Sequence, residues 1–124
     1  MNDSEVTMTD ALLKRSFIAH DKALEAAGAA IKLAVRVPAP LRTIADQVIR
    51  SANSVAANLA EGRGRSGRDR LNFFRIAYAS AREVDSHLRL LVQAGVVDAE
   101  EADTALATFD QVRAITWRLL HPAS

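Results

Sequence analysis

Arginine is concentrated in a short central stretch of this 124-residue chain. Five arginines lie close together there: Arg63, Arg65, Arg68, Arg70 and Arg75. The planar guanidinium group donates hydrogen bonds in a fixed fork that fits phosphate and carboxylate groups. Such a cluster could therefore bind the backbone of RNA or DNA, or the acidic side chains of another protein subunit.

The charge is distributed unevenly along the chain, although the net charge is only +1. Residues 36–89 contain ten arginines and five acids, a net charge of +5, whereas residues 1–35 and 90–124 carry −1 and −3. Every cation of the central segment is arginine rather than lysine, which favours recognition of phosphate or carboxylate. A coding bias toward arginine, neutralised by acidic ends, would give the same pattern, so charge alone leaves both interpretations open.

The turn that carries these arginines is rich in glycine. Residues 62–67 match G-x-G-x-x-G, but a dinucleotide fingerprint must follow a β-strand, and this match follows a helical pattern. Gly62 and Gly64 instead predict the end of a helix, because glycine adopts the left-handed conformation without steric cost. Ser66 and Asp69 have the spacing of a capping box. The free amides of the helix that begins there could hold a phosphate or carboxylate.

A second group of polar residues is spaced for the flanks of two helices. Ser54, Asn58 and Glu61 share one flank by three- and four-residue spacing, and Ser80 and Glu83 share a flank of the next helix. Small and polar side chains at these positions predict a close structural seam or a subunit interface. The amide and carboxylate groups there would need hydrogen-bond partners.

These polar residues form no recognisable catalytic or metal site. Ser80 and His87 are two helical turns apart, roughly 10 Å along the axis, which is too far for a histidine to activate a serine. The Glu-x-x-His pairs of di-iron bundles are absent, because Phe17, Val84 and Arg118 stand three positions before the histidines. The chain also has no cysteine. We therefore expect no enzyme activity, no cofactor and no bound metal.

Four helical patterns position these residues. Apolar side chains recur at helical spacing over about residues 10–35, 40–61, 67–94 and 98–120. Short connections make consecutive helices neighbours, so the predicted fold is all-α, an antiparallel up-down-up-down four-helix bundle. With 49% hydrophobic residues the chain can bury one core, which indicates a single domain over residues 1–124.

The same spacing predicts which side chains enter the core. The first helix has the stripe Leu13, Phe17, Leu24, Ala27, Ile31 and Val35. The third has Leu71, Phe74, Ala77, Ala81, Val84, Leu88 and Leu91, and the fourth has Ala102, Ala105, Phe109, Val112, Thr116 and Leu119. Trp117 lies off the last stripe, so we expect it at the core boundary or at an interface.

Two further features point to close contacts between helices. Gly28 lowers the helix propensity of the first helix by about 1 kcal/mol relative to alanine, and a close helix crossing would account for it. The second helix, about residues 40–61, is apolar over more than one face, as expected of a helix that also touches another subunit.

The segment from Arg50 to Glu83 resembles the signature of a bacterial four-helix-bundle family named for 23S rRNA intervening sequences. The residues that carry the resemblance are Ser54, Asn58, Glu61-Gly62, Gly64-Arg65, Phe73-Phe74, Ala77, Ser80 and Glu83. That family is similar in fold to the accessory proteins of diversity-generating retroelements. The resemblance implies a homopentamer of four-helix protomers, association with RNA or DNA and, by analogy with the retroelement proteins, a reverse transcriptase as partner.

Two functions are consistent with the sequence. In the favoured one, subunits form a ring that multiplies the arginine cluster and binds the backbone of RNA or DNA without reading bases. In the alternative, the arginines pair with acids of neighbouring subunits, and the protein is an assembly scaffold with no role in nucleic-acid binding.

No membrane role is expected. No apolar run approaches the roughly 20 residues that span a bilayer, and no signal peptide opens the chain. We therefore expect a cytoplasmic protein.

Overall fold

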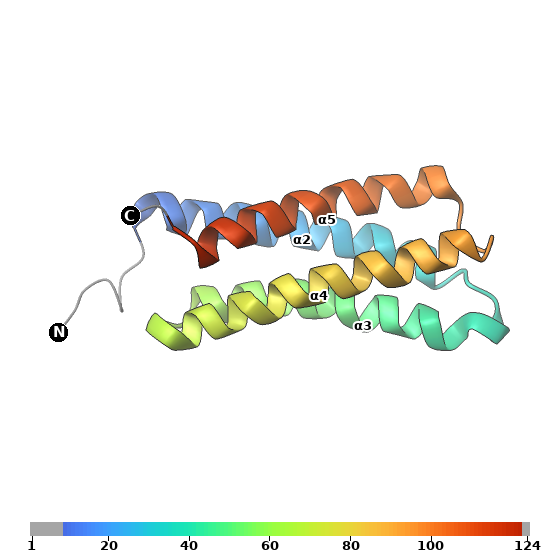
Figure 1. Cartoon of the computed structure of the whole chain (residues 1–124), viewed down its shortest axis with the longest axis horizontal. Coiled ribbons are helices and arrows are strands. Elements are labelled where there is room, and N and C mark those ends of the chain that lie inside the picture. Colours follow the sequence, from blue (N-terminus) through green and yellow to red (C-terminus); the bar gives the residue numbers. More distant parts are fainter. Residues whose placement is uncertain (1–8, 123–124) are drawn as a thin grey trace.

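A computed structural model describes residues 9–122 of the chain (Figure 1). It contains four long α-helices: α2 (Asp10–Ala34), α3 (Arg42–Arg63), α4 (Gly67–Gln93) and α5 (Ala99–Leu120). A short 3-10 helix, η1 (Ala39–Leu41), precedes α3. No strand occurs within the described residues, which confirms the predicted all-α class with four helices.

The four helices lie side by side and are joined by short connections. In Figure 1 the chain passes along α2, returns along α3, passes back along α4 and returns along α5. Both α2 and α4 pack against α3 and α5. The α3–α4 turn, the start of α2 and the end of α5 therefore lie at the same end of the bundle.

One hydrophobic core runs through all four helices. The predicted stripe of α5 is buried in full, and that of α4 is buried except for the half-buried Leu71. Phe74 of α4, Phe109 of α5 and Leu59 of α3 are among the largest fully buried side chains. Since burying a side chain of this size contributes roughly 1.5–3 kcal/mol, these three helices supply the bulk of the core.

The predicted core stripe of α2 is wrong. Of its six residues only Ala27 is buried, whereas Phe17, Leu24 and Val35 have 48%, 53% and 58% of their surface exposed. The buried side of α2 consists mainly of small residues: Ser16, Ala19, Ala23, Ala26, Ala27, Ala30, Leu33 and Ala34. Small side chains allow α2 to lie close to its neighbours, so its larger apolar side chains remain outside.

The predicted capping box at the start of α4 is absent, whereas α5 has a side-chain cap. The Asp98 side chain accepts a hydrogen bond from the backbone N–H of Glu101 at 3.1 Å and so caps α5. Ser66 precedes α4, but its side chain makes no cap hydrogen bond. Asp69, its predicted partner, lies 3.6 Å from Arg65 instead.

Residues 9–122 contain neither a membrane-spanning helix nor a cluster of metal-binding side chains. Within this range no helix combines the length and the apolar character needed to cross a bilayer. The described His, Asp and Glu side chains form no group of three or more that could hold a metal ion.

Candidate functional site

The α3–α4 turn brings the five central arginines to one end of the bundle (Figure 1). Arg63 is the last residue of α3, Arg65 lies between the helices, and Arg68, Arg70 and Arg75 lie in the first part of α4. We call these five residues the arginine cluster. Residues 61–75 contain two acids beside the five arginines, which leaves a net charge of +3.

The glycines of this turn have different roles from those that the sequence predicts. Gly62 is buried, and a Cβ atom there would lie 2.6 Å from the ring of Phe74. The helices can approach this closely only because residue 62 has no side chain. The left-handed conformation occurs at Gly67, with φ +57°, and Gly64 caps α3 with φ −86°. The predicted left-handed end at Gly62 or Gly64 is therefore wrong.

Arg65 is the member of the cluster that has carboxylate partners within residues 9–122. Its guanidinium lies 3.2 Å from Glu61 and 3.6 Å from Asp69, and its Cζ atom lies 5.1 Å from the centre of the Phe73 ring. Exposed ion pairs contribute at most about 1 kcal/mol to stability. These contacts orient Arg65 and neutralise its charge, but they do not neutralise the other four arginines of the cluster.

Arg63 and Arg70 are partly buried and lack hydrogen-bond partners on one nitrogen each. Cζ of Arg63 lies 4.2 Å from the centre of the Phe17 ring. Arg63 Nη1 and Arg70 Nε are buried with no partner among the described residues, and burial lowers the pKa of the Arg70 guanidinium below its usual value. A buried donor without an acceptor costs free energy, and these two nitrogens lie out of reach of solvent.

Four arginines on α4 are spaced seven residues apart: Arg68, Arg75, Arg82 and Arg89. Seven residues are close to two full turns, so these side chains share one side of the helix, roughly 10 Å apart. All four are exposed. We call them the arginine line. The seven-residue period is visible in the sequence. The sequence-based prediction nevertheless left out Arg82 and Arg89, because it relied on the density of arginines around the turn.

The members of the arginine line differ in their partners. Arg89 donates a hydrogen bond from Nε to Asp85 at 2.7 Å. Within residues 9–122, Arg68, Arg75 and Arg82 form no ion pair. Three positive charges along α4 therefore remain uncompensated by the described part of the chain.

Three of the five residues predicted for a polar seam or interface form hydrogen bonds with one another. The hydroxyls of Ser54 and Ser80 lie 2.8 Å apart across α3 and α4, and Asn58 donates to the Ser54 carbonyl at 2.8 Å and to its hydroxyl at 3.0 Å. Glu61 and Glu83 are exposed and do not join this network. The Ser54–Ser80 contact joins the middle of α3 to the middle of α4, and Asn58 supports it from within α3.

Trp117 lies near the end of α5, at the same end of the bundle as the α3–α4 turn. Half of its surface is exposed, and its ring stacks on His121 with centroids 4.2 Å apart and an interplanar angle of 26°. Nδ1 of His121 lies 2.9 Å from the Trp117 carbonyl oxygen. The pair forms an exposed aromatic surface that sequence spacing alone could not distinguish from a boundary of the core.

The comparisons with known proteins agree with this fold. The family model of the 23S rRNA-intervening sequence protein matches residues 15–118. The structure is similar to the crystal structure of a protein of unknown function from the S23 ribosomal protein family of Bacteroides thetaiotaomicron, with 22% identity and a TM-score of 0.78. The match covers 86% of this chain and 98% of that one; at this identity it shows the fold alone.

No curated protein matches the chain. The family model, however, covers all four helices, from the first turns of α2 to the last turn of α5. This protein therefore belongs to the family of 23S rRNA-intervening sequence proteins.

Proposed function

We propose that this protein is a non-enzymatic oligomer of antiparallel four-helix protomers that binds the backbone of RNA or DNA. The observation that carries the proposal is the arginine line: Arg68, Arg75 and Arg82 are exposed on one side of α4 and form no ion pair within residues 9–122. The membership of the family named for an rRNA insertion supports a nucleic acid as the polyanion.

The spacing of the line suits an extended polyanion. Arginines roughly 10 Å apart can each contact a phosphate of one strand, and each neutralised phosphate releases counterions. Contacts of this kind position the backbone and carry no sequence information. Arg63 and Arg70 add positive charge near the start of the line. The expected binding is therefore strongly salt-dependent and insensitive to base sequence.

Assembly would increase this effect. The exposed apolar side chains of α2, among them Phe17 and Leu24, support the proposal that protomers associate. A ring, with five members by family resemblance, would present several arginine lines to one nucleic acid. Linked weak sites of this kind bind more tightly together than any one of them does alone.

The test removes charge from the line and, in a control, from elsewhere. Arg68→Ala with Arg75→Ala should weaken binding to a labelled single-stranded RNA and reduce the salt slope by about 1.4 per bound protomer. Arg42→Ala with Arg50→Ala removes the same charge from α3 and should change the slope much less. Fluorescence anisotropy across a salt series gives the slopes, and light scattering gives the mass.

Two results would contradict the proposal. One is equal loss of RNA binding in both variants, because binding would then reflect overall charge and not the line. The other is dissociation of the Arg68→Ala, Arg75→Ala oligomer, because these arginines would then belong to a subunit interface. The second result would favour the alternative of an assembly scaffold without a nucleic-acid role, which the exposed apolar side of α2 also supports.

A further inference from the structure

The outward side of α2 contains a glycine that its own protomer does not require. Gly28 is exposed, and a Cβ atom at this position would meet no atom within 4 Å. The expected close helix crossing at Gly28 is therefore absent among residues 9–122. Glycine weakens a helix relative to alanine, and Gly28 relieves no steric contact within the described part of its own protomer.

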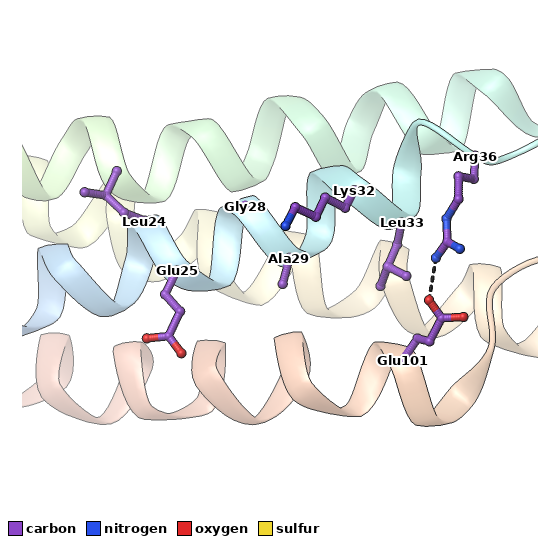
Figure 2. Close-up of a pocket in the computed structure, with 8 residues that line it drawn as sticks. All are labelled: Leu24, Glu25, Gly28, Ala29, Lys32, Leu33, Arg36 and Glu101. Carbon is purple, nitrogen blue, oxygen red and sulfur yellow. Dashed lines mark hydrogen bonds and ion pairs between the residues drawn. The ribbon is translucent and has the colours of Figure 1, made fainter.

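Gly28 lies at the edge of a groove between α2 and α5 with a volume of about 620 Å³ (Figure 2). Ala29 and Leu33 contribute small and apolar surface, and Glu25 and Lys32 project from α2 on either side of Gly28. At the far end Arg36 pairs with Glu101 of α5. Within the described residues neither Glu25 nor Lys32 forms an ion pair.

Between residues 21 and 36 the charges on this side of the chain are separated by sign about Gly28. Asp21, Glu25, Gly28 and Lys32 follow one another at spacings of four, three and four, so they form one stripe on α2. Arg36 follows four residues later, in the turn just past the end of α2. All five residues are exposed. The acids lie on the N-terminal side of Gly28, and the bases lie on the C-terminal side.

This pattern is complementary to itself in one orientation. If two α2 helices cross antiparallel near Gly28, the acidic half of each helix meets the basic half of the other. Two equivalent pairs then form, each between Glu25 of one copy and Lys32 of the other. A parallel crossing would place like charges together. The missing side chain at Gly28 lets the two backbones approach, and the exposed Leu24 beside it would be covered.

We propose that two copies of this chain associate through an antiparallel, two-fold contact between their α2 helices, centred on Gly28. Contacts of this isologous kind bring the same surface patch of both subunits together. The contact goes beyond the proposed function, because it uses α2 and not the arginine line. It can join protomers directly or join two rings that form through other surfaces.

The test is a charge exchange across the contact, with association measured by sedimentation equilibrium. Glu25→Lys places a lysine opposite a lysine in each of the two pairs between residues 25 and 32. Lys32→Glu places a glutamate opposite a glutamate in each of these pairs. Each single change should raise the dissociation constant about tenfold or more. The double variant Glu25→Lys, Lys32→Glu restores opposite charges and should return the constant to within about threefold of the original. Lys22→Glu, which lies off the stripe, should leave association unchanged.

A second variant tests the close approach. Gly28→Leu should dissociate the contact, and the open space around Gly28 lets the protomer retain its helical circular dichroism. Single exchanges that associate like the original chain, or a double variant as weak as the singles, would overturn the two-fold contact. A ring that is insensitive to all these changes but binds RNA would overturn this inference and leave the proposed function standing.

Discussion

The helices α2 and α4 occupy equivalent places in the bundle, each packed against α3 and α5, yet they present opposite kinds of surface. α4 buries its large side chains, such as Phe74 and Leu88, and exposes arginine at a regular spacing. α2 buries alanine and exposes Phe17 and Leu24 together with charges of both signs. The two helices solve the same packing problem with different side chains.

This difference indicates different partners for the two surfaces. A row of arginines, three of which form no ion pair within residues 9–122, is suited to a polyanion and should respond strongly to salt. Exposed apolar side chains flanked by acids and bases are typical of a contact with another protein, where apolar area is removed from water. Substitutions on α2 should therefore change assembly, whereas substitutions on α4 should change binding of nucleic acid.

The largest expected effect compares two phenylalanines. Phe109→Ala removes a fully buried ring from α5 and should lower the free energy of unfolding by about 3–5 kcal/mol. Phe17→Ala removes an exposed ring from α2 and should cost less than about 1 kcal/mol. Urea denaturation of dilute protein measures both values. Equal losses would mean that Phe17 belongs to the core after all.

A pair of glycines gives the next contrast. Gly62→Ala places a Cβ atom 2.6 Å from the Phe74 ring and should destabilise the bundle by about 1–3 kcal/mol. Gly28→Ala meets no neighbour and should stabilise the helix by up to about 1 kcal/mol. Thermal unfolding should show shifts of opposite sign, and the account of the α3–α4 turn fails if both alanines stabilise.

A third prediction compares leucines of similar exposure on the two helices. Leu24 of α2 and Leu90 of α4 have 53% and 50% of their surface exposed. Leu24→Asp should raise the dissociation constant of the proposed oligomer at least tenfold, or about 1.4 kcal/mol, because the proposed association buries its side chain. Leu90→Asp should have little effect. Light scattering over a dilution series measures both, and the reverse order would place the subunit interface on α4.

The smallest expected effect concerns single arginines. Reversing one charge with Arg75→Glu should weaken RNA binding about fivefold to tenfold at low salt, with the difference shrinking as salt rises. Arg50→Glu on α3 makes the same change outside the arginine line and should alter binding less. Identical curves for the two variants would show that the position along α4 does not matter.

The sequence predicted the cores of α4 and α5 because large apolar residues recur there on one side only. On α2 two sets of residues recur with the same helical spacing, one of alanines and one of larger side chains. Periodicity ranks the larger set first, since those side chains gain more from burial. Which set faces inward depends on how closely neighbouring helices can approach, and no single-helix pattern contains that information.

The residues of the candidate site could be predicted from the sequence, but the contacts between helices that constrain them could not. The arginine cluster, Ser54, Asn58 and Ser80 could be identified by residue type and spacing. The steric requirement at Gly62 could not, because it depends on the Phe74 ring of another helix. The same holds for the incompletely paired nitrogens of Arg63 and Arg70, which reflect burial and become visible only in the assembled bundle.

The central claim is that the arginine line of α4 holds a nucleic-acid backbone, and the salt dependence of RNA binding tests it most directly. For the original chain, the logarithm of the binding constant should fall linearly with the logarithm of salt concentration. Three phosphate contacts per protomer give a slope of about −2 on single strands, and a multiple of that for an oligomer. Absence of binding at low salt, or a slope near zero, would contradict the claim.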